Sequence, residues 1–76
     1  MANYSDILNG YKSELKGKRD SVTVNLSVLL DNPTSIPEHV DIVVEVDKLI
    51  EKLATIQEKI EMVDFVLKFK DSQWKL

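Results

Sequence analysis

Residues 42–67 read IVVEVDKLIEKLATIQEKIEMVDFVL, and this stretch decides the fold. Apolar residues recur in it at alternating steps of four and three, at Ile42, Val46, Leu49, Leu53, Ile56, Ile60, Val63 and Leu67. A seven-residue repeat of this kind places its apolar side chains along one stripe of an α-helix, as in a coiled-coil seam. We therefore predict a long helix over about residues 36–70.

The residues before this stretch predict a turn followed by a helix start. Ser35 stands three residues before Glu38, which is the pattern of a capping box. Pro37 then lies in the first helical turn, where a missing N–H costs nothing. Pro33 disfavours helical geometry in the residue before it, and Asn32 readily takes the left-handed conformation that ends helices. The sequence thus predicts a short turn near Asn32 and Pro33.

The first part of the chain predicts a second, weaker helix over about residues 4–30. Asn3 or Ser5 can cap a helix that begins near Tyr4. The apolar residues of one side are Leu8, Tyr11, Leu15, Val22, Leu26 and Leu29. Lys18 and Arg19 interrupt this seam, so we expect a local change of phase there. The fold class predicted for residues 1–76 is a single all-α domain, an antiparallel two-helix hairpin.

One alternative fold stays open at this point. Residues 22–30 and 40–47 also alternate with a period of two and are rich in β-branched side chains, as strands are. Their pairing would give a helix–strand–strand–helix fold. The capping box and the in-phase continuation of Ile42 and Val46 with Leu49 favour the helical interpretation. An isolated two-stranded hairpin is also poorly stable.

A turn near residue 33 sets the expected register of the two helices. Residues whose numbers sum to about 66 should then lie side by side, with Leu15 near Leu53. The second helix should extend past the first by about eight residues, or ~12 Å. That uncovered end would carry Phe69 and Trp74. Tryptophan is favoured at interface hot spots, so these two residues are the candidate partner-binding site. The alternative is that Trp74 packs on the second subunit or lies in a frayed tail.

Several apolar residues fall off both seams and predict self-association. A chain of 76 residues without cysteine has neither a large core nor disulfides to stabilise it. We predict a homodimer that forms a four-helix bundle. The residues expected at its interface are Val24, Val28, Val43, Val44, Ile50, Phe65 and Phe69.

A basic stripe on the first helix suggests a second kind of partner. Lys12, Lys16 and Arg19 are spaced by four and three, so they share one side. We expect this stripe to face acidic residues of the second helix, namely Asp47, Glu51 and Glu58. The alternative is a contact with nucleic acid or with an acidic protein. The net charge of −3 disfavours nucleic acid as the main partner.

Composition and motifs predict no catalytic, cofactor-binding or metal site. His39 is the single histidine, and neither Gly10 nor Gly17 belongs to a phosphate-binding motif. A metal shared between two chains near His39 is a minor alternative. The N-terminus lacks the pattern of a secretory signal and no apolar run is long enough for a membrane span, so we expect a cytoplasmic protein without a membrane partner. The predicted function is a non-enzymatic protein–protein interaction module, such as an adaptor, an assembly factor or an inhibitor. A small nucleic-acid-associated regulator is the alternative.

About half of the chain also resembles a known group of proteins. The resemblance lies in the segments NP at 32–33, IPEH at 36–39, DIV at 41–43 and DKL at 47–49, where the second helix is expected to begin. This pattern is similar to small uncharacterised helical proteins of large tailed bacteriophages, including those that infect cyanobacteria. The resemblance implies a phage protein that works in the host cytoplasm or in the virion. It implies no activity, cofactor or site residue.

Overall fold

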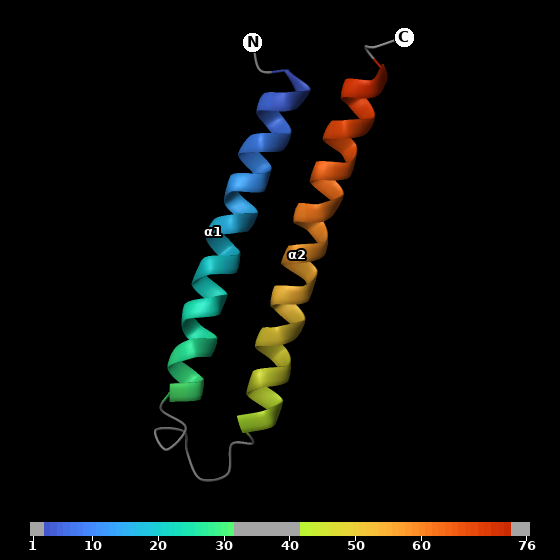
Figure 1. Cartoon of the computed structure of the whole chain (residues 1–76). Helices are drawn as coiled ribbons and strands as arrows, with labels where there is room; N and C mark the ends of the chain where they lie inside the picture. Colours follow the sequence, from blue (N-terminus) through green and yellow to red (C-terminus); the bar gives the residue numbers. More distant parts are fainter. Residues whose placement is uncertain (1–2, 32–41, 74–76) are drawn as a thin grey trace.

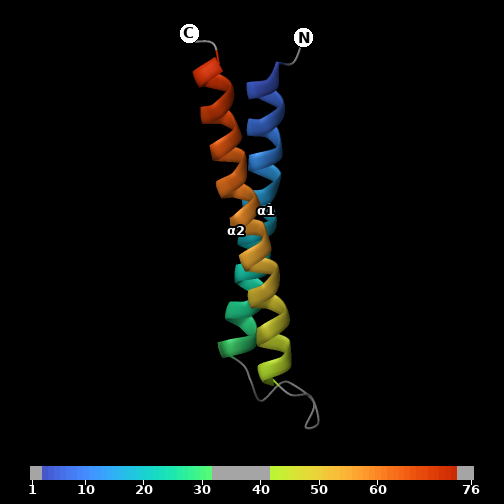
Figure 2. The ribbon, with the colours of Figure 1, turned by 90° about the vertical axis from the view of Figure 1, so that its right-hand side faces the viewer.

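The computed structural model describes residues 3–31 and 42–73, which form two long helices (Figure 1). Helix α1 spans Tyr4–Asp31 and helix α2 spans Ile42–Gln73. The two run antiparallel and side by side along their whole length, as two perpendicular views show (Figures 1 and 2). The predicted all-α hairpin is confirmed.

The helix–strand–strand–helix alternative is wrong for the part of the chain that the structure describes. Residues 21–30 and 42–47 are helical, so the alternation with a period of two is incidental. The predicted turn at Asn32 and Pro33 and the capping box of Ser35 and Glu38 lie outside the described residues.

The start of α1 has the expected cap. The Asn3 side-chain oxygen accepts a hydrogen bond from the Asp6 backbone N–H at 2.9 Å, and the Asn3 carbonyl accepts one from the Ile7 N–H at 3.1 Å. Asn3 is therefore the N-cap residue, and it satisfies a backbone donor that has no partner within the helix. Asp6 in the first turn adds negative charge at the positive end of the helix dipole.

The seam predicted for α2 is confirmed position by position. All eight apolar residues of the seven-residue repeat are buried or half-buried in the structure. Three side chains form the centre of the core, with Leu15 at 3% exposure and Ile60 and Val63 at 5% each. Leu8, Ile56 and Leu67 pack around them. Because each helix buries one stripe, the core is one layer of side chains.

The seam of α1 differs from the prediction. Its buried and half-buried positions run without a change of phase through Ser5, Leu8, Lys12, Leu15, Arg19, Val22, Leu26 and Leu29. The expected interruption at Lys18 and Arg19 is therefore wrong, and Tyr11 lies off the seam with 41% exposure. The reason is that long cationic side chains can bury their apolar stems while the charged group reaches polar atoms at the edge. Arg19 and Lys12 occupy seam positions in this way.

The register of the hairpin also differs from the prediction. Lys12 Nζ lies 2.6 Å from Asp64 Oδ1, and Arg19 Nη1 donates a hydrogen bond of 3.4 Å to Gln57 Oε1. The numbers in both pairs sum to 76, where a turn near residue 33 predicts 66. The pairing is therefore centred on residue 38. The paired segments are separated by more residues than the short turn predicted near residue 33 would contain. As a result, Leu15 packs with Ile60 and Val63 and not with Leu53.

The predicted overhang of the second helix is wrong for the same reason. The Tyr4 hydroxyl donates a hydrogen bond of 2.7 Å to Asp71 Oδ1, so the first turn of α1 lies level with the last turns of α2. The start of α1 and the end of α2 therefore lie together at one end of a slender molecule whose extents are 60 × 20 × 15 Å (Figure 1).

Candidate functional site

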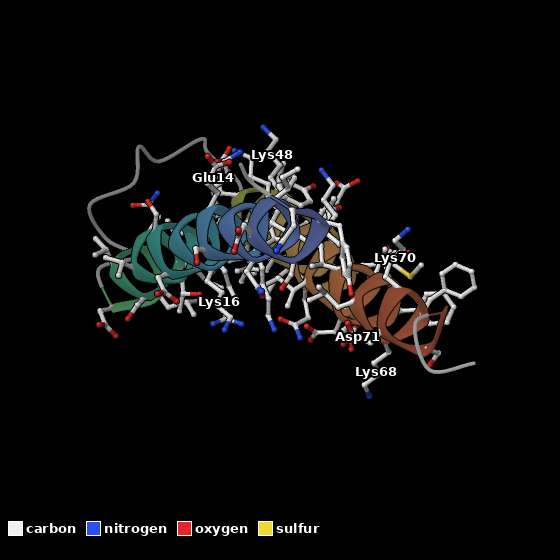
Figure 3. The ribbon with its side chains drawn as sticks, turned by 90° about the horizontal axis from the view of Figure 1, so that it is seen from above. Glu14, Lys16, Lys48, Lys68, Lys70 and Asp71 are labelled. Atoms are coloured by element: carbon white, nitrogen blue, oxygen red, sulfur yellow. The ribbon has the colours of Figure 1, made fainter. Side chains whose placement is uncertain are left out.

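The hairpin has two broad faces, one on each side of the plane that holds the two helix axes. Seen from above, Glu14 and Lys48 point to one side of this plane, and Lys16 and Asp71 point to the other (Figure 3). We call these sides the Glu14 face and the Lys16 face. Residues seven positions apart share a side of a coiled-coil helix, so other residues can be placed from the labelled ones.

The largest apolar cluster lies on the Glu14 face, near the start of α1 and the end of α2. Ile7 stands seven residues before Glu14, and Met62 and Phe69 stand fourteen and twenty-one residues after Lys48. Tyr11 and Val66 lie beside them, where with Met62 they line a shallow groove floored by Leu8 and Val63. We call the following five residues the terminal patch: Ile7, Tyr11, Met62, Val66 and Phe69. Their exposed fractions run from 37% for Val66 to 61% for Ile7.

The predicted interface residues are all exposed, but they do not form one surface. Val43 and Ile50 lie on the Lys16 face, since they precede Asp71 by multiples of seven, and Leu30 joins them from α1. Val24 and Phe65 each stand two residues from the seam positions on either side, so they lie on the outer sides of their helices. The same holds for Val44 in α2. Val28 lies on the Glu14 face at the far end from the terminal patch. Phe69 alone belongs to the terminal patch.

Sequence reasoning missed Ile7 and Tyr11 as members of one surface with Met62, Val66 and Phe69. With the register centred on residue 33, the start of α1 would have lain far from Phe69. The observed register brings Ile7 level with Phe69 and Tyr11 level with Val66. Trp74, the other residue of the predicted partner-binding end, lies outside the described residues.

The Glu14 face changes character along its length. Beyond Thr55, a second groove continues from the terminal patch toward the opposite end of the hairpin, and Val22, Leu49 and Ile56 line its base. Its edges carry the charged residues Lys18, Glu45, Lys48, Glu51 and Lys52. Lys48 is paired with Glu45 at 3.4 Å. The face is therefore apolar near the start of α1 and the end of α2. Its middle is charged, with Lys18, Lys52 and Lys59 on the face and Glu51 and Glu58 at its edge.

The basic stripe predicted on the first helix is largely held between the helices. Lys12 pairs with Asp64, its side chain 24% exposed, and Arg19 binds Gln57 and approaches Asp20 at 3.7 Å. The expected partners Asp47, Glu51 and Glu58 are wrong because the register is shifted. Lys16 points to solvent from the Lys16 face (Figure 3). The geometry thus leaves one of the three cations outside an interhelical contact.

The helix ends are joined by an aromatic and ionic contact. Lys70 Nζ lies 5.5 Å from the centroid of the Tyr4 ring, within the range of a cation–π interaction. The Tyr4 hydroxyl donates to Asp71, as described above. This hydrogen bond, with desolvation and the charge of the carboxylate adding to it, raises the pKa of the Tyr4 phenol above its ordinary value of 10.0.

The Tyr4 contact gives a prediction that tests the register directly. Because folding raises this pKa, the contact stabilises the hairpin fully below pH 10 and is lost as the pH rises through the higher folded-state pKa. Ultraviolet titration of tyrosinate, with Tyr4→Phe used to subtract the signal of Tyr11, should give a Tyr4 midpoint above 10.0. Asp71→Asn should return it toward that value. A Tyr4 midpoint that Asp71→Asn leaves unchanged would contradict the observed register.

Within residues 3–31 and 42–73, no three histidine, cysteine, aspartate or glutamate side chains gather closely enough to hold a metal ion. His39, on which the minor metal alternative depends, lies outside these ranges. Neither α1 nor α2 is long and apolar enough to cross a membrane.

Comparison with known proteins identifies no relative. No family model, no curated protein and no solved structure matches the chain.

Proposed function

We propose that this protein is a self-associating helical interaction module, a homodimer with an adaptor, assembly or inhibitory role and no catalytic activity. The observation that carries the proposal is the imbalance between buried and exposed apolar side chains. Among the described residues, Leu15, Ile60 and Val63 are buried, whereas twelve large hydrophobic residues are exposed by more than a third. Five of these twelve residues form the terminal patch, and clustered exposure marks association surfaces more often than isolated exposure does.

The surface area of the chain supports the same conclusion. Its accessible surface is 6019 Å². A compact monomer of 8.7 kDa would expose about 4,700 Å². The excess of roughly 1,300 Å² exceeds the ~800 Å² that each partner buries in an interface of standard size. The surplus surface of this elongated chain is therefore large enough to contain an interface of standard size.

Energetics explain why association and stability should be coupled. A helix in a protein gains most of its stability from packing of its apolar face, and each helix here packs one stripe. Burying an exposed valine, leucine or phenylalanine side chain is worth ~1.5–3 kcal/mol. A few such side chains match the ~5–15 kcal/mol that stabilises a whole domain. Binding of a second copy should thus stabilise the fold by mass action.

Sedimentation equilibrium over a wide range of protein concentration tests the proposal. We expect the mass to rise from that of the 8.7 kDa chain toward twice that value, with a Tm that rises with protein concentration. A mass of one chain up to millimolar concentration, with a Tm independent of concentration, would reject self-association.

The resemblance to small phage proteins, whose motif segments lie between residues 32 and 49, suggests a setting for this module. On that ground we propose that the module works in a phage-infected cytoplasm or in the virion. The nucleic-acid alternative gains no support from the described contacts, because Lys12 and Arg19 bind residues of α2.

A further inference from the structure

We infer that the terminal patch binds a second copy of this chain end to end, in antiparallel overlap. The overlap would involve the part of each hairpin that holds the start of α1 and the end of α2. The opposite ends of the two hairpins would point away from each other. Four helices would then pack together over the overlap alone. This inference rests on the proposed self-association and names the surface and the geometry that it uses.

Both helices bring exposed apolar side chains to the terminal patch at matching levels. Ile7 is 61% exposed opposite Phe69 at 54%, and Tyr11 is 41% exposed opposite Val66 at 37%. The groove between the helices is floored there by Leu8 and Val63. None of the five residues is charged, and the charged residues Glu58 and Lys59 line the same groove on the side toward the middle of the hairpin. Two copies can therefore bring these five residues together without burying an unpaired charge among them.

Charge disfavours parallel side-by-side overlap of two Glu14 faces. If two copies lay parallel along a common axis, each level would face the same level of the other copy. The charged middle of the face would then meet itself, with Lys18, Lys52 and Lys59 opposing the same three residues. Like charges brought together in an interface are strongly unfavourable. Antiparallel overlap limited to the helix ends keeps these lysines apart.

Charge also favours the antiparallel arrangement at the edges of the patch. In the observed register Glu14 lies level with Met62, four residues before Val66, and Lys70 lies four residues after Val66. A two-fold axis near Val66 therefore brings Glu14 of each copy level with Lys70 of the other. Both side chains point to the Glu14 face (Figure 3). The overlap thus sets one acidic and one basic group against each other on each side of the axis.

The Lys16 face is a poorer choice for the same partner. Its exposed apolar residues, such as Leu30 and Ile50, lie at the opposite end of the hairpin. That face is acidic. Asp71 points to it, as Lys68 does (Figure 3), and Asp47 and Glu61 share it because they precede Lys68 by multiples of seven. Two such faces would repel each other.

Small-angle X-ray scattering of the full chain at a concentration where sedimentation shows a dimer separates the arrangements. One hairpin is 60 Å long. An end-to-end dimer that overlaps by about twelve residues of helix should reach roughly 100 Å. A dimer whose longest dimension stays near 60 Å would overturn the inference and leave the proposed self-association standing.

A matched pair of variants tests the surface itself. Phe69 and Phe65 are both exposed on α2, at 54% and 61%, and only Phe69 belongs to the terminal patch. Phe69→Asp should weaken dimerisation by at least about a hundredfold, because both copies lose the side chain. Phe65→Asp should change the dimerisation constant by no more than about twofold. Circular dichroism of both variants checks that the helices remain.

The remaining outcomes also decide the inference. Equal weakening by the two variants, or weakening by Phe65→Asp alone, would overturn it. Growth of open-ended assemblies would overturn it as well, since an end-to-end dimer uses its patch completely. A chain that stays monomeric at every concentration would overturn both this inference and the proposed self-association.

Discussion

Leu15→Ala is expected to cause the largest loss of stability of any single truncation in α1. Leu15 is 3% exposed and packs against Ile60 and Val63, each at 5%. Removing a buried leucine side chain costs the transfer free energy of the lost atoms and leaves a cavity, together ~2–5 kcal/mol. Because the core has one layer, this is a large part of the ~5–15 kcal/mol that stabilises typical domains. We expect Leu15→Ala to be partly or wholly unfolded at room temperature.

Leu30→Ala is the matched control, since the substitution and the helix are the same. Leu30 is 55% exposed and lies on the Lys16 face, so its truncation should cost less than about 1 kcal/mol. Urea denaturation followed by circular dichroism, at one fixed protein concentration, measures both variants. Similar losses for Leu15→Ala and Leu30→Ala would show that Leu15 is not at the centre of the core.

Arg19→Leu is expected to stabilise the hairpin, which is the second largest effect that we predict. Arg19 occupies a seam position between Leu15 and Val22, and its hydrogen bond to Gln57 is long, at 3.4 Å. Leucine there would complete an apolar seam, and polar residues at such positions generally reduce the stability of coiled coils. The gain in the free energy of unfolding should be about 1–2 kcal/mol.

Lys16→Leu controls for the change from a long cationic residue to leucine. Lys16 is exposed on the same helix, so its replacement should alter the free energy of unfolding by less than about 0.5 kcal/mol. Urea midpoints at a fixed protein concentration measure both changes. A lower midpoint for Arg19→Leu than for the unchanged chain would mean that Arg19 does not lie on the seam.

The polar residues of the seam also explain why the two helices adopt one register, although their apolar residues would allow several. The Lys12–Asp64 and Arg19–Gln57 contacts form in one alignment of the helices, whereas leucine and isoleucine pack acceptably in several. A single polar residue in a coiled-coil seam specifies register at some cost in stability. We therefore expect Arg19→Leu to gain stability and lose part of this specificity.

The helix pair itself could be predicted from the sequence because α2 states its seam completely. All eight apolar positions of residues 42–67 follow one repeat, and every one of them is buried or half-buried. The seam of α1 was harder to recognise because Lys12 and Arg19 occupy two of its positions. A pattern that counts apolar residues alone treats such cations as interruptions, although their stems are apolar.

The register, and with it the terminal patch, could not be predicted in the same way. Register depends on how much of the chain separates the paired segments, and no local pattern states that length. The prediction placed the reversal near Pro33, while the contacts of Lys12 and Arg19 centre it on residue 38. Only with that shift do Ile7 and Tyr11 lie beside Val66 and Phe69.

Dilution followed by two-dimensional NMR tests most directly whether a second copy covers the terminal patch. On dilution from millimolar to low micromolar protein, the side-chain signals of Ile7, Met62 and Val66 should shift together with one concentration dependence. The signals of Val24 and Leu30, which are exposed by 60% and 55% but lie elsewhere, should stay in place. Signals of the terminal patch that do not move, or movement confined to Val24 and Leu30, would contradict the account.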